Sequence, residues 1–190
     1  MPAREHVASA SIKVAGQRLD PADMDHVEKI EVRNFVGLPD MATIRMADPE
    51  GRHIADPPFF IGDEIEISLG DVAATSTKPV FTGEIVTFEP EFTNAAAMIC
   101  VRAYDKSHRL HRNRRSATFQ DMTLSDVVGK IVNDSGLQAG TIDSTTTVHP
   151  FLQQSMESDL DFINRLAAQG TSSFHFVSTT GQKVDKLQGP

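Results

Sequence analysis

The stretch from residue 98 to residue 137 constrains the fold most, because it encodes a strand, a basic segment and a capped helix in succession. Apolar residues alternate over 98–104 with the two-residue period of a pleated strand. A helix is predicted further on: Asp126 follows Thr123 by three residues, as in a capping box, and Gly136 supplies a left-handed end. Between these ends, apolar residues recur at helical spacing: Leu124, Val127, Val128, Ile131 and Val132. A strand therefore leaves a sheet and feeds a short helix that packs by one face.

Basic residues concentrate between this strand and this helix, in residues 106–115, which we call the basic elbow. Residues 102–115 hold six basic residues and one acidic residue, whereas the whole chain has a net charge of −8. An acidic body with one basic segment argues against general nucleic-acid binding, which uses a broad basic face. It favours a charge-complementary contact with another protein or another copy of the chain. A solvated loop is the simpler interpretation. The candidate interface residues in the elbow are Arg109, Arg112, Arg114 and Arg115.

Further strands are predicted before the elbow, over residues 28–33, 42–46, 61–69 and 80–88, with a weaker one near residues 12–19. In the clearest of them, alternate residues are expected to face inward and outward: Ile65, Ile67 and Leu69 against Glu64, Glu66 and Ser68. The polar stretch after Pro21 and the proline-rich residues 48–58 are predicted to be loops.

Two strands, 80–88 and 98–104, carry apolar residues at both alternations. In the first, Phe81 and Ile85 are expected on one face, with Val86 and Phe88 on the other. Such strands must be covered on both faces. A barrel interior covers one face, and either a neighbouring subunit or a helix of the same chain covers the other. Phe88 is therefore the apolar candidate interface residue.

After the first helix, residues 141–150 are predicted to be an extended link. A second helix is expected from an N-cap at Ser158 to residue 169, where Gly170 ends it. Residues 174–187 resemble a broken hairpin that turns at Thr180 and Gly181.

The sequence contains no P-loop, no dinucleotide-binding glycine motif and no nucleophile-elbow motif. Asp105, His108 and His111 could bind a metal, although the surrounding basic residues disfavour a divalent cation. Cys100 could act as a nucleophile with His108 as its base, but a buried structural cysteine fits its position within a strand better. We therefore expect no enzymatic activity and no cofactor. A single cysteine fits synthesis in a reducing cytoplasm, and the longest apolar run is too short to span a membrane.

Four segments carry a family resemblance through their order and spacing: FTGEIVTFEP, VRAYDKSHRL, TFQDMTLSDVVGKI and QQSMESDLDFINRLA. In this order they resemble the phage late control D (tail hub) family and the related hub segment of VgrG-like spike proteins of contractile injection systems. The resemblance covers residues 60–168 and implies a non-enzymatic, homotrimeric hub of tube-like β-barrels that joins an inner tube to a spike. Members of that family generally continue for many more strands, whereas this sequence ends at Pro190.

The predicted fold is α+β and mainly antiparallel β. Residues 1–105 are expected to form a first tube-like β-barrel, and residues 106–190 a two-helix segment that starts a second barrel. The predicted function is a structural baseplate hub of a contractile tail or injection system, joining the inner tube to the central spike. The subunit is expected to be made in the cytoplasm and to become part of a tail-like particle that can be released from the cell. Expected partners are two further copies in a homotrimer, the inner tube protein, a spike or spike-tip protein and other baseplate subunits; neither nucleic acid nor membrane insertion is expected. A metal-dependent hydrolase using Asp105, His108 and His111, and a nucleic-acid-binding adaptor, are the alternatives.

Overall fold

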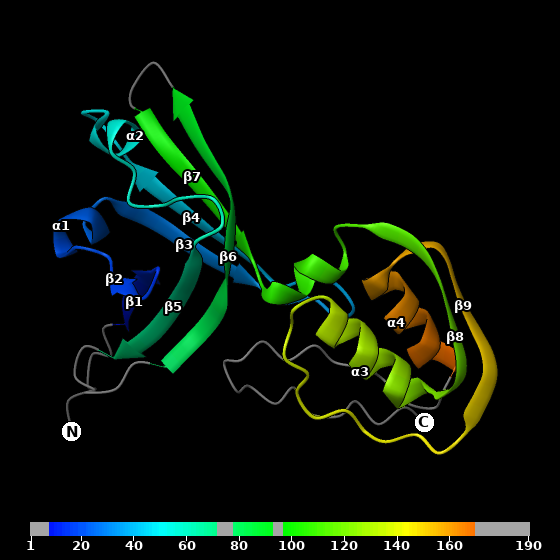
Figure 1. Cartoon of the computed structure of the whole chain (residues 1–190). Coiled ribbons are helices and arrows are strands. Elements are labelled where there is room, and N and C mark those ends of the chain that lie inside the picture. The colour runs from blue at the N-terminus through cyan, green and yellow to red at the C-terminus, as the bar shows by residue number, and fades with distance from the viewer. Residues whose placement is uncertain (1–7, 72–77, 93–96, 170–190) are drawn as a thin grey trace, which may run out of the picture. The chain divides into compact units, whose positions relative to one another are not determined.

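The computed structural model describes residues 8–71, 78–92 and 97–169, which form two compact units (Figure 1). The first unit comprises the described residues up to 34 together with 40–105, and the second comprises 35–39 together with the described residues from 106 onward. Each unit has its own hydrophobic core. Among the described residues, no helix has the length and apolar character needed to cross a membrane.

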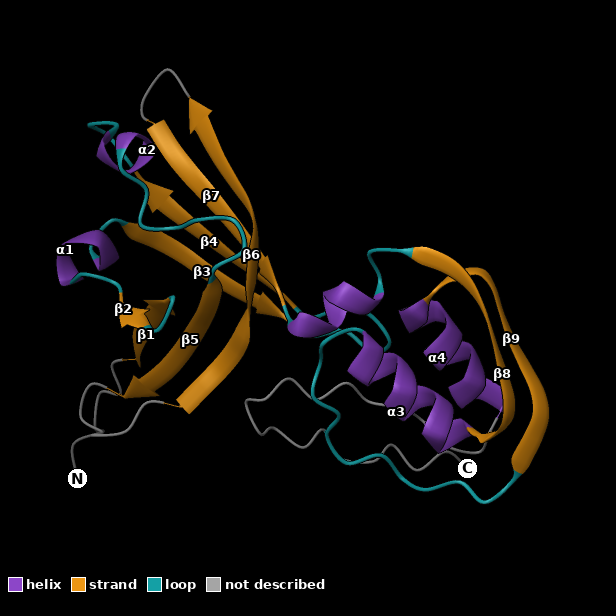
Figure 2. Ribbon diagram, in the orientation of Figure 1, coloured by secondary structure: helices purple, strands orange, loops and turns teal. Residues whose placement is uncertain are grey.

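The first unit is a seven-stranded antiparallel sheet in the order β2-β1-β5-β6-β7-β4-β3 (Figure 2). Its strands are β1 (Ala8–Val14), β2 (Gln17–Arg18), β3 (Val27–Arg33), β4 (Met41–Ala47), β5 (Glu64–Asp71), β6 (Lys78–Phe92) and β7 (Ala97–Tyr104). The prediction of an α+β fold that is mainly antiparallel β is confirmed.

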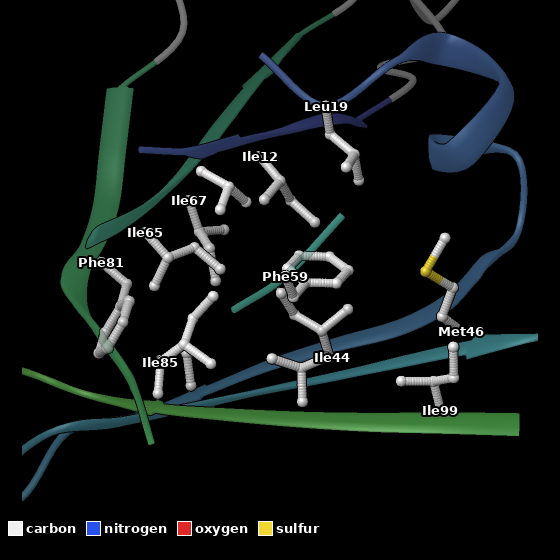
Figure 3. Packing of buried hydrophobic residues seen from close by; sticks show 14 residues of the cluster. Ile12, Leu19, Ile44, Met46, Phe59, Ile65, Ile67, Phe81, Ile85 and Ile99 are labelled. Atoms are coloured by element: carbon white, nitrogen blue, oxygen red, sulfur yellow. The ribbon is translucent and has the colours of Figure 1, made fainter. Parts of the chain in front are cut away.

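One core lies inside this curved sheet, as Figure 3 shows. Ile12 and Ile67 reach it from the paired strands β1 and β5, and Ile44 and Ile99 reach it from the paired strands β4 and β7. Phe59, from the segment before β5, fills the space between these side chains and is 1% exposed. Each side chain of this kind contributes roughly 1.5–3 kcal/mol by its burial. Apolar contacts between strands near opposite edges of the sheet therefore hold it in its curved form.

Strand β5 differs from the prediction at its end in which residues are buried. Ile65 and Ile67 are fully buried, as expected, but Ser68 is buried and Leu69 is exposed. The register between β5 and β6 shifts between Ile67 and Ser68. The extra residue of this bulge, Val80, belongs to β6, whereas β5 pairs with β1 without interruption, so the alternation of side chains along β5 is unchanged. Ser68 lies on the same face as Glu66, to which its hydroxyl donates at 3.4 Å, and it is buried there. Only the burial of Ser68 and the exposure of Leu69 differ from what alternation alone predicts.

A second bulge in strand β6 explains why this strand carries apolar residues at both alternations. The register against β7 shifts between Ile85 and Thr87, after which Phe88 pairs with Val101. Val101 lies in the core, and Phe88 packs against the same core. The prediction that Phe88 faces outward is therefore wrong, because the bulge brings it to the side on which Ile85 already lies.

Two segments that were predicted to be loops each contain a short helix: α1 (Pro21–Met24) and α2 (Arg52–Ala55). The side chain of Asp20 accepts a hydrogen bond from the backbone of Ala22, and Pro21 occupies the first turn of α1, where its missing N–H costs nothing. Gly51 precedes α2 in the left-handed conformation, at φ 70°. In both places, residues typical of turns serve as helix starts.

The second unit pairs two long antiparallel strands and covers them with two helices (Figure 1). Its elements are the 3-10 helix η1 (Lys106–Leu110), β8 (Arg114–Thr123), α3 (Leu124–Asp134), β9 (Val148–Ser158) and α4 (Asp159–Gln169). The main buried side chains from both helices and from η1 and β8 form one core: Leu110, Phe119, Val127, Ile131, Leu160, Phe162, Ile163 and Leu166.

Sequence analysis missed both strands of this unit: it assigned no strand to residues 114–123, and it described residues 141–150 only as an extended link. The second helix is confirmed: the hydroxyl of Ser158 accepts the backbone N–H of Asp161 at 3.0 Å, at the start of α4. Gly170 and the predicted hairpin over residues 174–187 lie outside the described residues.

The predicted ends of α3 are confirmed. Thr123 and Asp126 form a reciprocal capping box, in which the hydroxyl of Thr123 accepts the backbone N–H of Asp126 at 3.2 Å. At the other end, Gly136 has φ 68°, and the backbone N–H of Leu137 donates to the carbonyl of Val132 at 3.1 Å. This is the Schellman arrangement, which satisfies carbonyl groups that the helix leaves open.

Replacing either end of α3 should destabilise the second unit. Thr123→Ala removes the cap and should cost about 1 kcal/mol of unfolding free energy. Gly136→Ala forces a positive φ on alanine and should cost a similar amount, about 1 kcal/mol, although there is open space around its Cβ. Urea unfolding monitored by circular dichroism measures both. Gly140→Ala is the control, because Gly140 is not in the left-handed conformation. Equal unfolding midpoints for all three variants and the parent would contradict the assigned ends of α3.

Candidate assembly interface

The basic elbow is anchored at its beginning and exposed at its end. Ser107, His108 and Leu110 on η1 are buried, and Leu110 belongs to the core of the second unit. The three following residues lie at the surface, and Arg114 begins β8. The elbow is therefore a fixed part of the second unit rather than a freely solvated loop.

Arg115, a predicted interface arginine, forms an ion pair inside the second unit. The guanidinium of Arg115 donates to the carboxylate of Asp159 at 2.7 Å. The side-chain amide of Gln154 donates to the same carboxylate oxygen at 2.9 Å. Asp159 lies in the first turn of α4, where a negative charge is favourable next to the helix dipole. Arg115 therefore joins β8 to α4. Its guanidinium can contribute to the predicted interface only while it also keeps this ion pair with Asp159.

Two of the other predicted interface arginines are accessible to a partner at the surface of the second unit. Arg112 and Arg114 are exposed, and Arg109 is half-buried. Arg112 contacts Nε2 of His108 at 3.0 Å. Because a guanidinium can only donate, Nε2 is the acceptor in this hydrogen bond. The contact orients Arg112 while leaving it at the surface, so that Arg112 and Arg114 present two planar cations on one short segment.

The three residues of the metal-site alternative each have a separate hydrogen-bond partner. The carboxylate of Asp105 accepts the backbone N–H of Asp40 at 2.9 Å. His108 faces Arg112, and Nδ1 of His111 lies 3.4 Å from the hydroxyl of Ser158. Among the described residues, no group of three histidine, cysteine, aspartate or glutamate side chains could hold a metal ion. The metal-dependent hydrolase has no support in the described part of the chain.

A buried cluster that sequence analysis missed lies in the first unit. His53 is 2% exposed, and its two ring nitrogens each face a carboxylate: Nδ1 lies 3.1 Å from Asp48 and Nε2 lies 3.0 Å from Asp23. Arg52 also donates to Asp23, and the ring of His26 packs edge-on against His53. These residues come from two separate stretches of the sequence, 23–26 and 48–53, so no single motif with fixed spacing could have revealed the whole cluster. The cluster fastens α1 to α2.

Asp48 is the central carboxylate of this cluster. Burial pushes its pKa upward, but the backbone N–H groups of His53 and Ile54 and the ring of His53 donate to it and push the pKa further downward. The net pKa of Asp48 lies below its ordinary value. Its own backbone N–H donates to the carbonyl of Ala97 at 2.9 Å, which joins the cluster to the start of β7.

Comparison with protein families assigns the chain. The model described as "Alg8 N-terminal domain" matches residues 4–185, nearly the whole sequence. The chain belongs to the Alg8 N-terminal domain family. Among curated proteins, no match was found for this Alg8 N-terminal domain.

Solved structures with the same fold come from tails and secretion systems. The 43 kDa tail protein of prophage MuSo2 from Shewanella oneidensis is 16% identical, with a TM-score of 0.69 over 86% of this chain and 48% of its own length. An Escherichia coli component of the type VI secretion system, described as similar to the T4 tail proteins gp27 and gp5, is 21% identical, with a TM-score of 0.58 over 83% of this chain and 42% of its own. A chain of the Francisella PdpA–VgrG complex is 14% identical, with a TM-score of 0.57 over 87% of this chain and 26% of its own.

This Alg8 N-terminal domain therefore has a tail-hub-like fold and spans less than half the length of each of these proteins. The resemblance found in the sequence is confirmed at the level of the fold, since phage tail and VgrG-related structures match. The family itself is the Alg8 N-terminal domain rather than one described as a tail family.

Lowering the pH should reduce the stability that Asp48 gives to this Alg8 N-terminal domain. Its pKa is lower in the folded chain than its ordinary value of 3.8, so its stabilising contribution is complete above pH 3.8 and is lost as the pH falls through the folded pKa. Asp48→Asn should lower the unfolding free energy at pH 7 by about 2 kcal/mol. It should also flatten the loss of stability below pH 4. Urea unfolding at pH 7 and pH 3 measures both effects, with the exposed Asp143→Asn as control; parallel losses in parent and Asp48→Asn would contradict this.

Proposed function

We propose that this chain is a structural part of a tail-like contractile particle, namely the hub that joins the inner tube to the central spike. The observation that supports this most is the extent of the likeness to the prophage tail protein, which reaches a TM-score of 0.69 over 86% of the chain. A hub needs surfaces that bind other subunits and needs no catalytic constellation. The proposal accordingly assigns no catalysis and no cofactor to the chain.

Two features of the described residues support a role in assembly. Arg112 and Arg114 are exposed on an anchored segment, and arginine forks recognise carboxylates with defined geometry. Large apolar side chains are also exposed, mainly outside the regular core-facing positions: Val36, Leu38, Phe60, Ile61, Phe92, Val148, Phe151 and Met156. Within this set Phe60 and Ile61 are consecutive in the sequence, and exposed large apolar side chains that lie together mark binding sites.

Apolar contacts and ion pairs are expected to play different parts in assembly, because their free energies differ. Burial of one large apolar side chain contributes roughly 1.5–3 kcal/mol, whereas an exposed ion pair contributes about 0–1 kcal/mol. Apolar contacts should therefore set the strength of assembly, and the arginines should set its orientation and rate. The proposed partners are two further copies in a homotrimer, the inner tube protein, a spike or spike-tip protein and other baseplate subunits.

Co-expression with the inner tube and spike proteins of the same particle tests the proposal. The parent chain should be recovered in one complex with both, and native mass spectrometry should give three copies of it. The double variant Arg112→Glu, Arg114→Glu should assemble more slowly or into fewer complexes while its circular dichroism spectrum is unchanged.

Arg18→Glu with Lys78→Glu is the matched control, because it reverses two exposed charges outside the elbow and changes the net charge equally. This control should assemble like the parent. A chain that stays monomeric with both partners present would overturn the proposal. Binding to nucleic acid that weakens steeply with salt would instead favour the adaptor alternative.

A further inference from the structure

Negative charge collects in three short segments of the first unit. Residues 20–28, 48–56 and 89–92 together hold nine acidic residues and one basic residue. Their net charge of −8 equals that of the whole chain, so the remaining residues are neutral in sum. The negative net charge of this protein is therefore concentrated in these three segments rather than spread evenly along the chain.

The three segments lie at one end of the first unit. The backbone N–H of Asp48 donates to Ala97, which pairs with Phe92 across the β6–β7 hairpin. His53 then joins Asp48 to Asp23 on α1. Figure 1 shows α1 and α2 near the end of the sheet at which β6 ends and β7 begins. We call this region the acidic end.

The acidic end offers charge and one apolar side chain to a partner. Six acidic residues there are exposed: Asp20, Asp25, Glu28, Glu50, Asp56 and Glu91. Glu89 is exposed as well and is paired with Arg102 at 2.7 Å. Phe92, at the end of β6, is 73% exposed. Phe92 directly follows Glu91 in the sequence, and an exposed aromatic residue next to acidic residues fits a binding patch whose partner is basic.

The basic elbow begins at the other end of β7. Strand β7 runs eight residues from Ala97, beside the acidic end, to Tyr104, and the elbow starts two residues later. Strand β7 itself is roughly 24 Å long, at about 3.4 Å per residue. The acidic end and the basic elbow carry opposite charges, so each has its complement on another copy of the chain.

We propose that the acidic end of one copy binds the basic elbow of the next copy, so that copies associate head to tail. Such a contact is heterologous and produces a closed ring when the rotation between copies closes. Phe92 supplies apolar contact, while Arg112 and Arg114 select the orientation by meeting carboxylates such as Glu50 and Glu91. The inference deepens the proposed function, and it rests on that function only for the number of copies in the ring.

Charge exchange between the two patches tests the contact. One variant reverses the elbow (Arg112→Glu, Arg114→Glu), a second reverses the acidic end (Glu50→Arg, Glu91→Arg), and a third carries all four substitutions. Sedimentation equilibrium at fixed ionic strength should show at least tenfold weaker self-association for each of the first two. The third should return to within about threefold of the parent, because its reversed patches match again. Arg18→Glu with Lys78→Glu is the control and should associate like the parent.

Mixing the first two variants adds a second readout. Each can bind the other, so a mixture should form pairs that neither forms alone. A ring of three cannot alternate between two kinds of copy, and the mixture should therefore regain pairs but not complete trimers.

Failure of this inference differs from failure of the proposed function. If the parent self-associates and the fourfold variant is as weak as the single-patch variants, the elbow does not bind the acidic end, and the inference is overturned while the hub proposal stands. A parent chain that is monomeric alone also overturns the inference. Only a chain that fails to enter complexes with tube and spike proteins overturns the hub proposal.

Discussion

Gly83→Ala is expected to destabilise the first unit by about 3 kcal/mol, the upper range for overpacking a tight core. A Cβ at this position would lie 2.3 Å from the backbone oxygen of Tyr104 and 2.7 Å from Cζ of Phe81. Both contacts are far inside van der Waals distance. The oxygen belongs to β7, which pairs with β6 on one side and β4 on the other, so it cannot shift without disturbing the sheet.

Urea unfolding monitored by fluorescence or circular dichroism measures this effect. Gly129→Ala is the matched control, because it lies within α3 and its Cβ would meet only Ile142, at 3.8 Å. Alanine is the better helix former, so this control should be neutral or more stable by up to about 1 kcal/mol. Similar losses of stability in both variants would show that the close approach of β6 and β7 at Gly83 is incorrect.

Phe162→Ala is expected to cost about 4 kcal/mol in the second unit, the usual scale for emptying a buried phenylalanine site. Phe162 is fully buried and stacks on Phe119 of β8, with ring centroids 5.6 Å apart. Its ring also supports Arg165, whose guanidinium carbon lies 4.9 Å from the centroid. The substitution therefore removes the contact that joins α4 to the strands and leaves a cavity.

Hydrogen exchange measured by mass spectrometry locates the effect. Amides of β8, β9 and α4 should exchange much faster in Phe162→Ala, whereas those of β4 and β7 in the first unit should change little. Phe151→Ala makes the same chemical change at an exposed site on β9 and should alter exchange only locally. A uniform increase across both units would contradict the description of two cores.

The parts of the fold that sequence analysis predicted well are those specified by neighbouring residues. The ends of α3 were predicted because the capping box and the left-handed glycine each act on residues close to them in the sequence. The N-cap of α4 at Ser158 was predicted for the same reason. Ile65 and Ile67 were placed in the core because alternation along a strand needs no knowledge of its partner.

The errors arose where a distant strand decides the outcome. Phe88 changed face because of a bulge in β6, and a bulge depends on the partner strand as much as on its own residues. β8 and β9 were missed because each gains its stability from pairing with the other and from the helices that cover both. The cluster around His53 could not be predicted, since Asp23 and Asp48 reach it from separate segments.

The sequence predicted the candidate interface only through a local excess of basic residues. Five basic residues within ten positions identified the elbow, but nothing in the sequence showed that Arg115 is held by Asp159. Likewise, the acidic residues are scattered over three segments in the sequence. Only the fold gathers them at one end.

Counting this chain in purified tail-like particles tests the central claim most directly. Particles isolated from cells that express the chain, with its own tube and spike proteins, would be analysed by quantitative mass spectrometry against labelled peptide standards. If the chain is the hub that joins tube to spike, each particle should retain three copies, and particles should lack a spike when the chain is deleted. Particles that keep their spike without the chain, or that contain no copies of it, would contradict that role.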